Sequence, residues 1–181
     1  FVWHSYCDWY LEFLKPIFNS KNLEEINEAK KFSSYMMSNM LKILHPFIPF
    51  FTETVWSRNK YKKIFKTDLI SSTWPGYKIM PKFNKSHKNI NDLIILISNI
   101  RSTKAELKIT PKLFCDLYLP KVSKNLNILI KDNLRLLKNI GRVNNVYNKK
   151  INDKNSIDII VFKDKISLNF NEDIDLLSQK Q

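Results

Sequence analysis

Hydrophobic side chains dominate the first sixteen residues of the chain and recur there at helical spacing. They form two neighbouring stripes, while polar residues occupy the remaining side. The stripes contain Val2, Tyr6, Trp9 and Phe13, and Trp3, Cys7, Tyr10 and Leu14. The pattern predicts a helix that ends at Pro16, because proline cannot continue the helical hydrogen bonds. Since this hydrophobic density begins at Phe1, we expect the chain to be a piece of a longer protein.

The next hundred residues predict three more helices. Asn22 and Glu25 form a capping pair that opens a helix running to about Leu44. Pro46 and Pro49 suit the first turn of a third helix. A long helix is predicted over 86–108. The residues expected inside are Leu23, Ile26, Ala29, Phe32, Met36, Met40 and Ile43; Phe50, Phe51, Val55 and Trp56; and Ile90, Leu93, Ile97, Ile100 and Leu107.

After Pro111 the period of the pattern shortens and becomes typical of strands. The predicted elements are a strand at 114–119 bounded by Pro120, a helix at 124–140 ended by Gly141, strands at 143–147, 157–162 and 166–170, and a helical end at 172–181. The fold class predicted is mainly α, with a small α/β module.

Composition and charge narrow the possible functions. The 181 residues are 44% hydrophobic, enough for a packed core, and carry a formal net charge of +13. Such a charge favours a polyanionic partner, although a proteome rich in Lys and Asn would produce the same surplus. Cys7 and Cys115 lie far apart in unrelated contexts, which indicates a reducing, cytosolic setting. The longest apolar run, 93–97, is too short to cross a membrane.

The sequence contains no recognisable catalytic apparatus. With Gly76 and Gly141 as its only glycines, it cannot form a Gly-rich phosphate loop. His4, Cys7 and Asp8 share one helix face, but no second cluster completes a metal site, so we interpret them as structural. We therefore expect no catalytic residue, no metal site and no cofactor in this chain.

Two basic clusters are candidates for contacts with RNA. Arg101, Lys104 and Lys108 recur at i, i+3 and i+7 on the predicted long helix. We favour RNA contact for this stripe, because a helix needs only one or two charges to stay soluble. The second cluster is Arg58, Lys60, Lys62, Lys63 and Lys66, with Tyr61 and Phe65 between them. Its aromatic residues either stack on unpaired bases or pack inward, and the sequence leaves both interpretations open.

Four segments together resemble the C-terminal part of valyl-tRNA synthetases. They are 1–16, centred on Cys-Asp-Trp-Tyr-Leu-Glu at 7–12; 41–56, with His-Pro-Phe-Ile-Pro-Phe-Phe-Thr-Glu-Thr-Val-Trp; Ser-Thr-Trp-Pro at 72–75; and 100–112, with Ile-Arg-Ser-Thr-Lys-Ala-Glu. The second pattern fits several class I synthetases for aliphatic amino acids, and the first and last narrow the resemblance to the valyl family. The resemblance covers 1–112 well and 113–181 more loosely.

That resemblance implies three domains. They are a helical-bundle anticodon-binding domain at 1–112 whose first helices precede Phe1, a small α/β junction module at 113–170, and the start of a coiled-coil arm at 171–181. Enzymes of this family attach valine to tRNA(Val) with ATP and Mg²⁺ and hydrolyse misacylated threonine. The class I signatures His-Ile-Gly-His and Lys-Met-Ser-Lys-Ser do not occur here. The resemblance therefore implies a tRNA-binding region that lacks the catalytic and editing sites.

We accordingly expect a cytoplasmic monomer that binds tRNA(Val), and neither DNA nor a membrane. The residues predicted to contact tRNA, on charge and placement alone, are Arg58, Lys60, Lys62, Lys63, Arg101, Lys104 and Lys108. Two alternatives stay open: the equivalent region of an isoleucyl or leucyl enzyme, and a helical protein-interaction domain whose charge reflects proteome bias.

Overall fold

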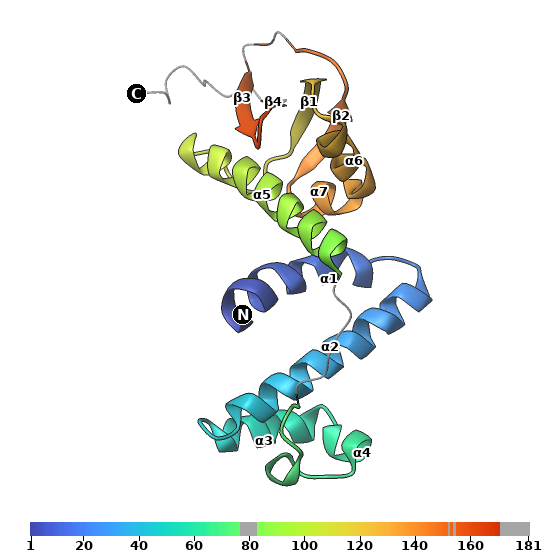
Figure 1. Ribbon diagram of the computed structural model, residues 1–181. Coiled ribbons are helices and arrows are strands. Elements are labelled where there is room, and N and C mark those ends of the chain that lie inside the picture. The colour runs from blue at the N-terminus through green and yellow to red at the C-terminus, as the bar shows by residue number, and fades with distance from the viewer. Residues whose placement is uncertain (77–82, 152, 154, 171–181) are drawn as a thin grey trace. The chain divides into compact units, whose positions relative to one another are not determined.

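The structure is a computed structural model that describes residues 1–76, 83–151, 153 and 155–170 (Figure 1). The chain divides into two units, Phe1–Pro81 and Lys82–Gln181. In the described residues, the first unit is helical and the second combines helices with a four-stranded sheet. This arrangement confirms the fold class predicted from the sequence. The helical end predicted at 172–181 lies outside the described residues.

The opening helix differs from its prediction in geometry and in length. Val2–Tyr10 form a π-helix, η1, in which the Tyr6 N–H donates to the Phe1 carbonyl five residues back at 3.1 Å. Helix α1, Leu11–Phe18, follows directly and contains Pro16, so the prediction that the helix ends there was wrong. The Asn19 N–H donates to the Lys15 carbonyl at 3.1 Å, and this bond carries the helix past the proline.

Helices α2 and α3 begin where the sequence predicts. In α2, Leu23–Leu44, the Asn22 side chain accepts the N–H groups of Glu24 and Glu25 at 3.1 and 3.2 Å. Pro49 opens α3, Pro49–Arg58, whereas Pro46, also predicted in its first turn, lies in the turn before the helix. A short helix α4, Tyr61–Phe65, and a 3₁₀ turn η2, Leu69–Ser71, complete the described part of this unit.

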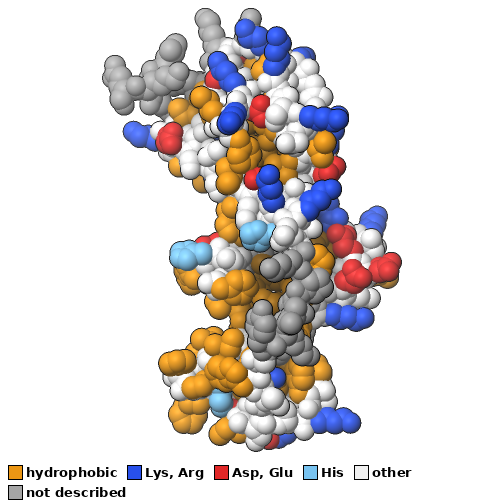
Figure 2. Space-filling view, in the orientation of Figure 1, with side chains coloured by type: hydrophobic (Ala, Val, Ile, Leu, Met, Phe, Trp, Pro, Cys, Tyr) orange, Lys and Arg blue, Asp and Glu red, His pale blue; other side chains and the backbone are white. Residues whose placement is uncertain are grey.

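The core of the first unit agrees with its prediction only in part. One cluster joins Leu41, Trp56, Tyr61 and Leu69, with Met37 and Val55 against them. Ala29 and Met40 of α2 are buried, as predicted. Phe50 and Phe51, predicted inside, are 89% and 64% exposed, because α3 packs through the side that bears Thr52 and Trp56. Leu23, Phe32 and Ile43 of α2 are also exposed. Figure 2 shows hydrophobic side chains on the surface of this unit.

Helix α5, Asn84–Glu106, belongs to the second unit. Its buried face contains Leu93, Leu96, Ile97 and Ile100 and packs on strand β3 and helix α6. The sequence grouped this helix with the helical domain at 1–112. In the structure its apolar face packs on the sheet and on α6, so by contacts the helix falls in the second unit, while the domain bounds themselves stay a prediction.

The sheet has the order β2-β1-β4-β3. Its strands are β1 Cys115–Lys121, β2 Val143–Tyr147, β3 Ser156–Val161 and β4 Asp164–Asn169. β1 and β2 are parallel, and α6 Lys124–Asp132 and α7 Leu134–Ile140 form the crossover between them. β4 pairs antiparallel with β1 and with β3. Leu117 of β1 lies opposite Leu168 of β4, and both are buried.

Two predictions in this unit were wrong in detail. The helix predicted at 124–140 breaks at Asn133, whose side-chain amide donates to the Leu129 carbonyl at 2.8 Å. Strand β1 continues through Pro120. The described pairing of β1 with β2 ends at Tyr118, and its register with β4 shifts between Tyr118 and Lys121. A proline is tolerated at such a position because no ladder bond is lost there.

Candidate nucleic-acid interface

The basic segment of the first unit, residues 58–66, surrounds the short helix α4. Lys60 before this helix and Lys66 after it adopt left-handed backbone conformations, with φ of 58° and 55°. These turns let α4 pack against α3. As a result, the aromatic and basic side chains of the segment have different surroundings.

The aromatic residues of this segment pack on Trp56. The ring centroid of Trp56 lies 5.1 Å from that of Tyr61 and 5.2 Å from that of Phe65. The Trp56 indole N–H donates to the Thr67 carbonyl at 3.2 Å, and the Tyr61 hydroxyl donates to the Ser34 carbonyl at 3.3 Å. Of the two interpretations left open by the sequence, the structure therefore supports inward packing for Tyr61. Phe65 stays partly exposed.

The cations of the same segment lie at the surface. Arg58, Lys60 and Lys63 are exposed. The Lys62 ammonium lies 2.7 Å from a carboxylate oxygen of Asp68, and this hydrogen bond raises the pKa of Lys62. Because exposed ion pairs are weak, a phosphate group can compete with Asp68 for this lysine.

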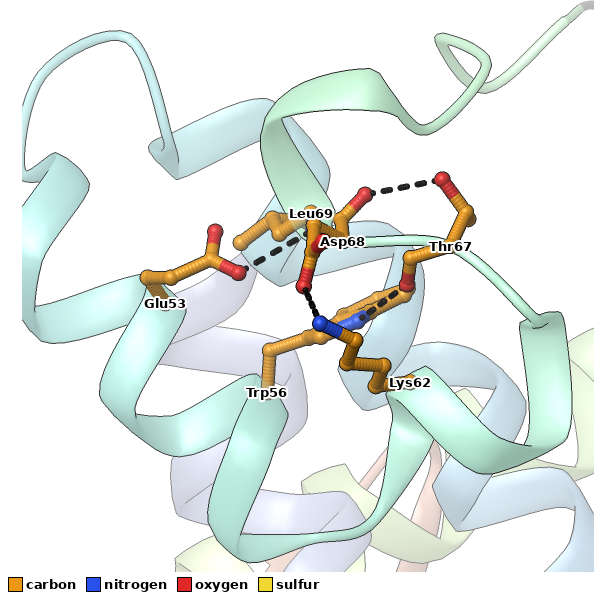
Figure 3. Close-up of polar contacts among 6 residues, drawn as sticks. All are labelled: Glu53, Trp56, Lys62, Thr67, Asp68 and Leu69. Carbon is orange, nitrogen blue, oxygen red and sulfur yellow. Dashed lines mark hydrogen bonds and ion pairs between the residues drawn. The ribbon is translucent and has the colours of Figure 1, made fainter.

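The loop that follows α4 is held to α3 by side chains of that helix (Figure 3). A carboxylate oxygen of Glu53 accepts the Leu69 N–H at 3.3 Å, and Trp56 binds the carbonyl of Thr67. The exposed cations of residues 58–66 therefore project from backbone that is packed against α3.

Lys104, predicted to contact RNA from the surface of the long helix, is only 2% exposed. Its ammonium group donates to the Leu113 carbonyl at 2.8 Å and to the Gly141 carbonyl at 3.4 Å. The prediction of a surface stripe was therefore wrong at this residue. The physical reason is tertiary: the approach to β1 and the end of α7 turn backbone carbonyls toward α5, and a lysine satisfies them.

Burial lowers the pKa of the Lys104 ammonium. The positive charges of Arg142 and Arg101 lower this pKa further, while the Cys115 thiol acts in the opposite direction. Burial in turn raises the pKa of Cys115. Arg101, on the same helix, and Arg142, 38 positions further along the chain, are thus both close enough to Lys104 to influence its charge.

Arg101 and Lys108, the other members of the predicted stripe, differ in their surroundings. The Arg101 guanidinium donates to the Ile140 carbonyl at 3.2 Å, and cations at a helix C-terminus stabilise its unpaired carbonyls. Lys108 lies past the end of α5, is exposed and has φ of 51°. Arg101 and Lys104 therefore stabilise the end of α7, and Lys108 remains at the surface.

Phe114 and Arg142, which the sequence did not single out, lie beside the backbone carbonyls that Lys104 binds. The guanidinium carbon of Arg142 lies 5.5 Å from the centre of the Phe114 ring. Phe114 is 45% exposed, and Arg142 is exposed as well. In sequence, Phe114 only marked the start of a strand and Arg142 only followed a helix end, so neither carried a signal of function.

The remaining candidates for chemistry make local contacts. His4 Nδ1 lies 3.6 Å from a carboxylate oxygen of Asp8, and His45 Nδ1 lies 2.8 Å from the Thr52 hydroxyl. Among the described residues, no group of three His, Cys, Asp or Glu side chains could hold a metal ion. No helix in the described part of the chain is long and apolar enough to cross a membrane.

Exposed cations on packed helices, together with a small α/β module, are features that a nucleic-acid-binding domain requires. The family model described as the anticodon-binding domain of tRNA ligase matches residues 1–119, and the chain belongs to this family. More particularly, the chain is similar to valine–tRNA ligases, which confirms the valyl resemblance found in the sequence.

Three of these relatives show how far the similarity extends. The valine–tRNA ligase of Pelagibacter ubique is 38% identical over 176 residues, which cover 97% of this chain and 20% of the relative. That of Agrobacterium fabrum is 30% identical over 183 residues, covering 99% of this chain and 19% of the relative. That of Brucella suis is 39% identical over 110 residues, covering 60% of this chain and 12% of the relative. The chain thus spans about a fifth of the length of the first two relatives.

Proposed function

We propose that this chain is the tRNA(Val)-binding region of a valine–tRNA ligase. The observation that carries the proposal is the match of residues 1–119 to the anticodon-binding family, combined with the exposed cations Arg58, Lys60 and Lys63 in this matched region. The valine–tRNA ligase relatives favour the valyl enzyme over an isoleucyl or leucyl one.

The residues proposed to contact tRNA follow from exposure and charge. Arg58, Lys60 and Lys63 meet phosphate groups directly, and Lys62 joins them by exchanging Asp68 for a phosphate. Lys108 provides a further exposed cation in the second unit. An anticodon loop suits such a surface because its bases are unpaired and its backbone is accessible. Lys104 is left out of this set because its ammonium is buried.

We extend this proposal to the activity of the whole protein. The remaining parts of such a ligase activate valine with ATP and Mg²⁺, transfer it to tRNA(Val) and hydrolyse misacylated threonine. Editing is needed because an apolar pocket cannot strongly reject an isostere that bears a hydroxyl group. We further propose a cytoplasmic monomer that does not bind DNA, in which 113–170 is the junction module and 171–181 begins a coiled-coil arm.

A helical protein-interaction domain is the second candidate function. The exposed side chains of Phe47, Phe50 and Phe51 favour it, since clustered apolar residues at a surface are typical of contact sites. Salt dependence separates the candidates, because binding to nucleic acid phosphates weakens steeply as salt concentration rises.

Filter binding of the chain to tRNA(Val), and to a version with its anticodon changed, tests the proposed function. We expect tighter binding to tRNA(Val) and a loss of affinity of about tenfold or more for Arg58→Glu combined with Lys63→Glu. The matched control is Lys30→Glu with Lys31→Glu, which makes the same change in charge on the exposed part of α2. Equal binding to both RNAs would exclude anticodon reading, and the absence of any salt-dependent binding to RNA would favour the protein-interaction domain.

A further inference from the structure

We propose that Phe114 and Arg142 form a stacking site for an unpaired nucleotide of the bound RNA, with Arg101 nearby to attract its phosphates. This inference rests on the proposed function and deepens it, because it assigns RNA contact to residues outside the predicted basic clusters. Phe114 directly precedes β1 and Arg142 directly precedes β2. The parallel pairing of these two strands therefore brings the two residues together.

The two backbone segments of the site are fastened to each other. The Cys115 N–H donates to the Arg142 carbonyl at 3.0 Å. The buried Lys104 ammonium binds the carbonyls of Leu113 and Gly141, the residues that come directly before Phe114 and Arg142. Lys104 is therefore a positioning residue, since one buried group holds both segments of the site in place.

The electrostatics of the site favour an anion. Arg101 and Arg142 both lower the pKa of Lys104, because each of their positive charges repels the ammonium group. The carboxylate next to this cluster, that of Asp116, raises the pKa of Cys115, and it accepts hydrogen bonds from the backbone and side-chain amides of Asn145. A polyanionic ligand relieves such repulsion, and RNA supplies the negative charge as phosphate groups.

The exposed groups of the site match a nucleobase. Unpaired bases stack on aromatic rings and on the planes of arginine side chains, and the Phe114–Arg142 pair offers both. Every base has a π-face, so we expect little sequence preference. A base inside a duplex is already stacked and cannot enter the site, so the site selects single-stranded RNA.

Binding of a short single-stranded RNA and of the same RNA as a duplex, each with a fluorescent label, tests this inference on the 181-residue chain. Phe114→Leu keeps an apolar side chain but removes the aromatic ring. Arg142→Lys keeps the positive charge but removes the planar guanidinium group. We expect each substitution to weaken single-strand binding about fivefold or more and to leave duplex binding unchanged. Phe114→Tyr retains the ring and should retain the affinity. The matched control is Phe162→Leu, because Phe162 is 47% exposed in the turn between β3 and β4.

The outcomes distinguish this inference from the proposed function. If the unchanged chain binds RNA in a salt-dependent way while Phe114→Leu and Phe162→Leu bind alike, the stacking site is excluded and the proposed function stands. If the unchanged chain binds neither of these two RNAs, the stacking site is excluded, and the filter binding to tRNA(Val) described above decides the proposed function separately. Far-UV circular dichroism shows whether each variant is folded. Should Phe114→Leu unfold, Arg142→Lys decides the question, because this exposed side chain can change without loss of the core.

Discussion

The ammonium group of Lys104 donates a hydrogen bond of 2.8 Å to the carbonyl oxygen of Leu113. This bond joins the last turn of α5 to the segment that enters β1, and the longer bond to the Gly141 carbonyl joins the same lysine to the end of α7. A residue predicted to face RNA is thus part of the interior of the second unit. Substitution of a buried, hydrogen-bonded cation destabilises the structure, because the carbonyl groups that it binds cannot form hydrogen bonds with water instead.

Replacing Lys104 by glutamate should destabilise the second unit by about 3 kcal/mol or more, since a buried carboxylate would then face two carbonyl oxygens. Urea unfolding followed by far-UV circular dichroism measures this change. Lys108→Glu, four residues along and exposed, is the control and should unfold like the unchanged chain. Equal stability of the two variants would mean that Lys104 is at the surface.

Stability should rise with pH on account of Lys104. Its pKa in the folded chain lies below the ordinary lysine value of 10.5, so between the two values the unfolded chain binds more protons than the folded chain. The free energy of unfolding therefore gains up to about 1.4 kcal/mol per pH unit in that window. The measurement is the difference in unfolding free energy between the unchanged chain and Lys104→Met, from neutral pH up to pH 10.5. A difference that does not rise would contradict the lowered pKa.

Gly141→Ala should destabilise the chain although the backbone angles of Gly141 suit any residue. Its φ is −76°, but an added Cβ would lie 2.8 Å from the Leu137 carbonyl oxygen. Relief of such a contact costs about 1–3 kcal/mol, which urea unfolding resolves. Gly76→Ala is the matched control, because an added Cβ there meets no atom within 4 Å. The prediction fails if both alanine variants unfold at the same urea concentration.

Trp56→Leu should cost about 3 kcal/mol of unfolding free energy in the first unit, since it removes a fully buried ring and the bond to the Thr67 carbonyl. The same substitution at Trp74, which is 58% exposed, should change stability by about 0.5 kcal/mol or less. Equilibrium unfolding monitored by circular dichroism compares the two. A larger loss at Trp74 would show that the aromatic cluster around Trp56 does not hold this unit together.

Local features of the fold could be predicted because they depend on neighbouring residues. Asn22 caps α2, Pro49 opens α3 and Gly141 ends α7, each as the sequence predicts. Gly141 has a different reason from the expected one, however. Its φ is negative, and the left-handed residue at this helix end is Arg142. Close approach to a carbonyl, which no sequence pattern shows, is what requires glycine.

The candidate site could be predicted only in part. Arg58, Lys60 and Lys63 are exposed, as the prediction of RNA contact requires, although the contact itself stays a prediction. Periodicity placed Phe50 and Phe51 inside because it identifies apolar side chains without identifying what covers them. It could not pair Phe114 with Arg142, since 28 positions separate them and only the parallel pairing of β1 and β2 brings them together.

By itself, the sequence determined the mainly α class, the helix ends with local caps, and the resemblance to valyl-tRNA synthetases, because side-chain spacing and short motifs are properties of neighbouring residues. Only the tertiary structure decided which cations are available to a ligand. Lys104 and Lys108 lie one helical turn apart in sequence, yet one is buried against two carbonyl groups and the other is exposed. The difference arises because α7 and the entry to β1 cover α5 at Lys104, and the chain turns away from the helix before Lys108.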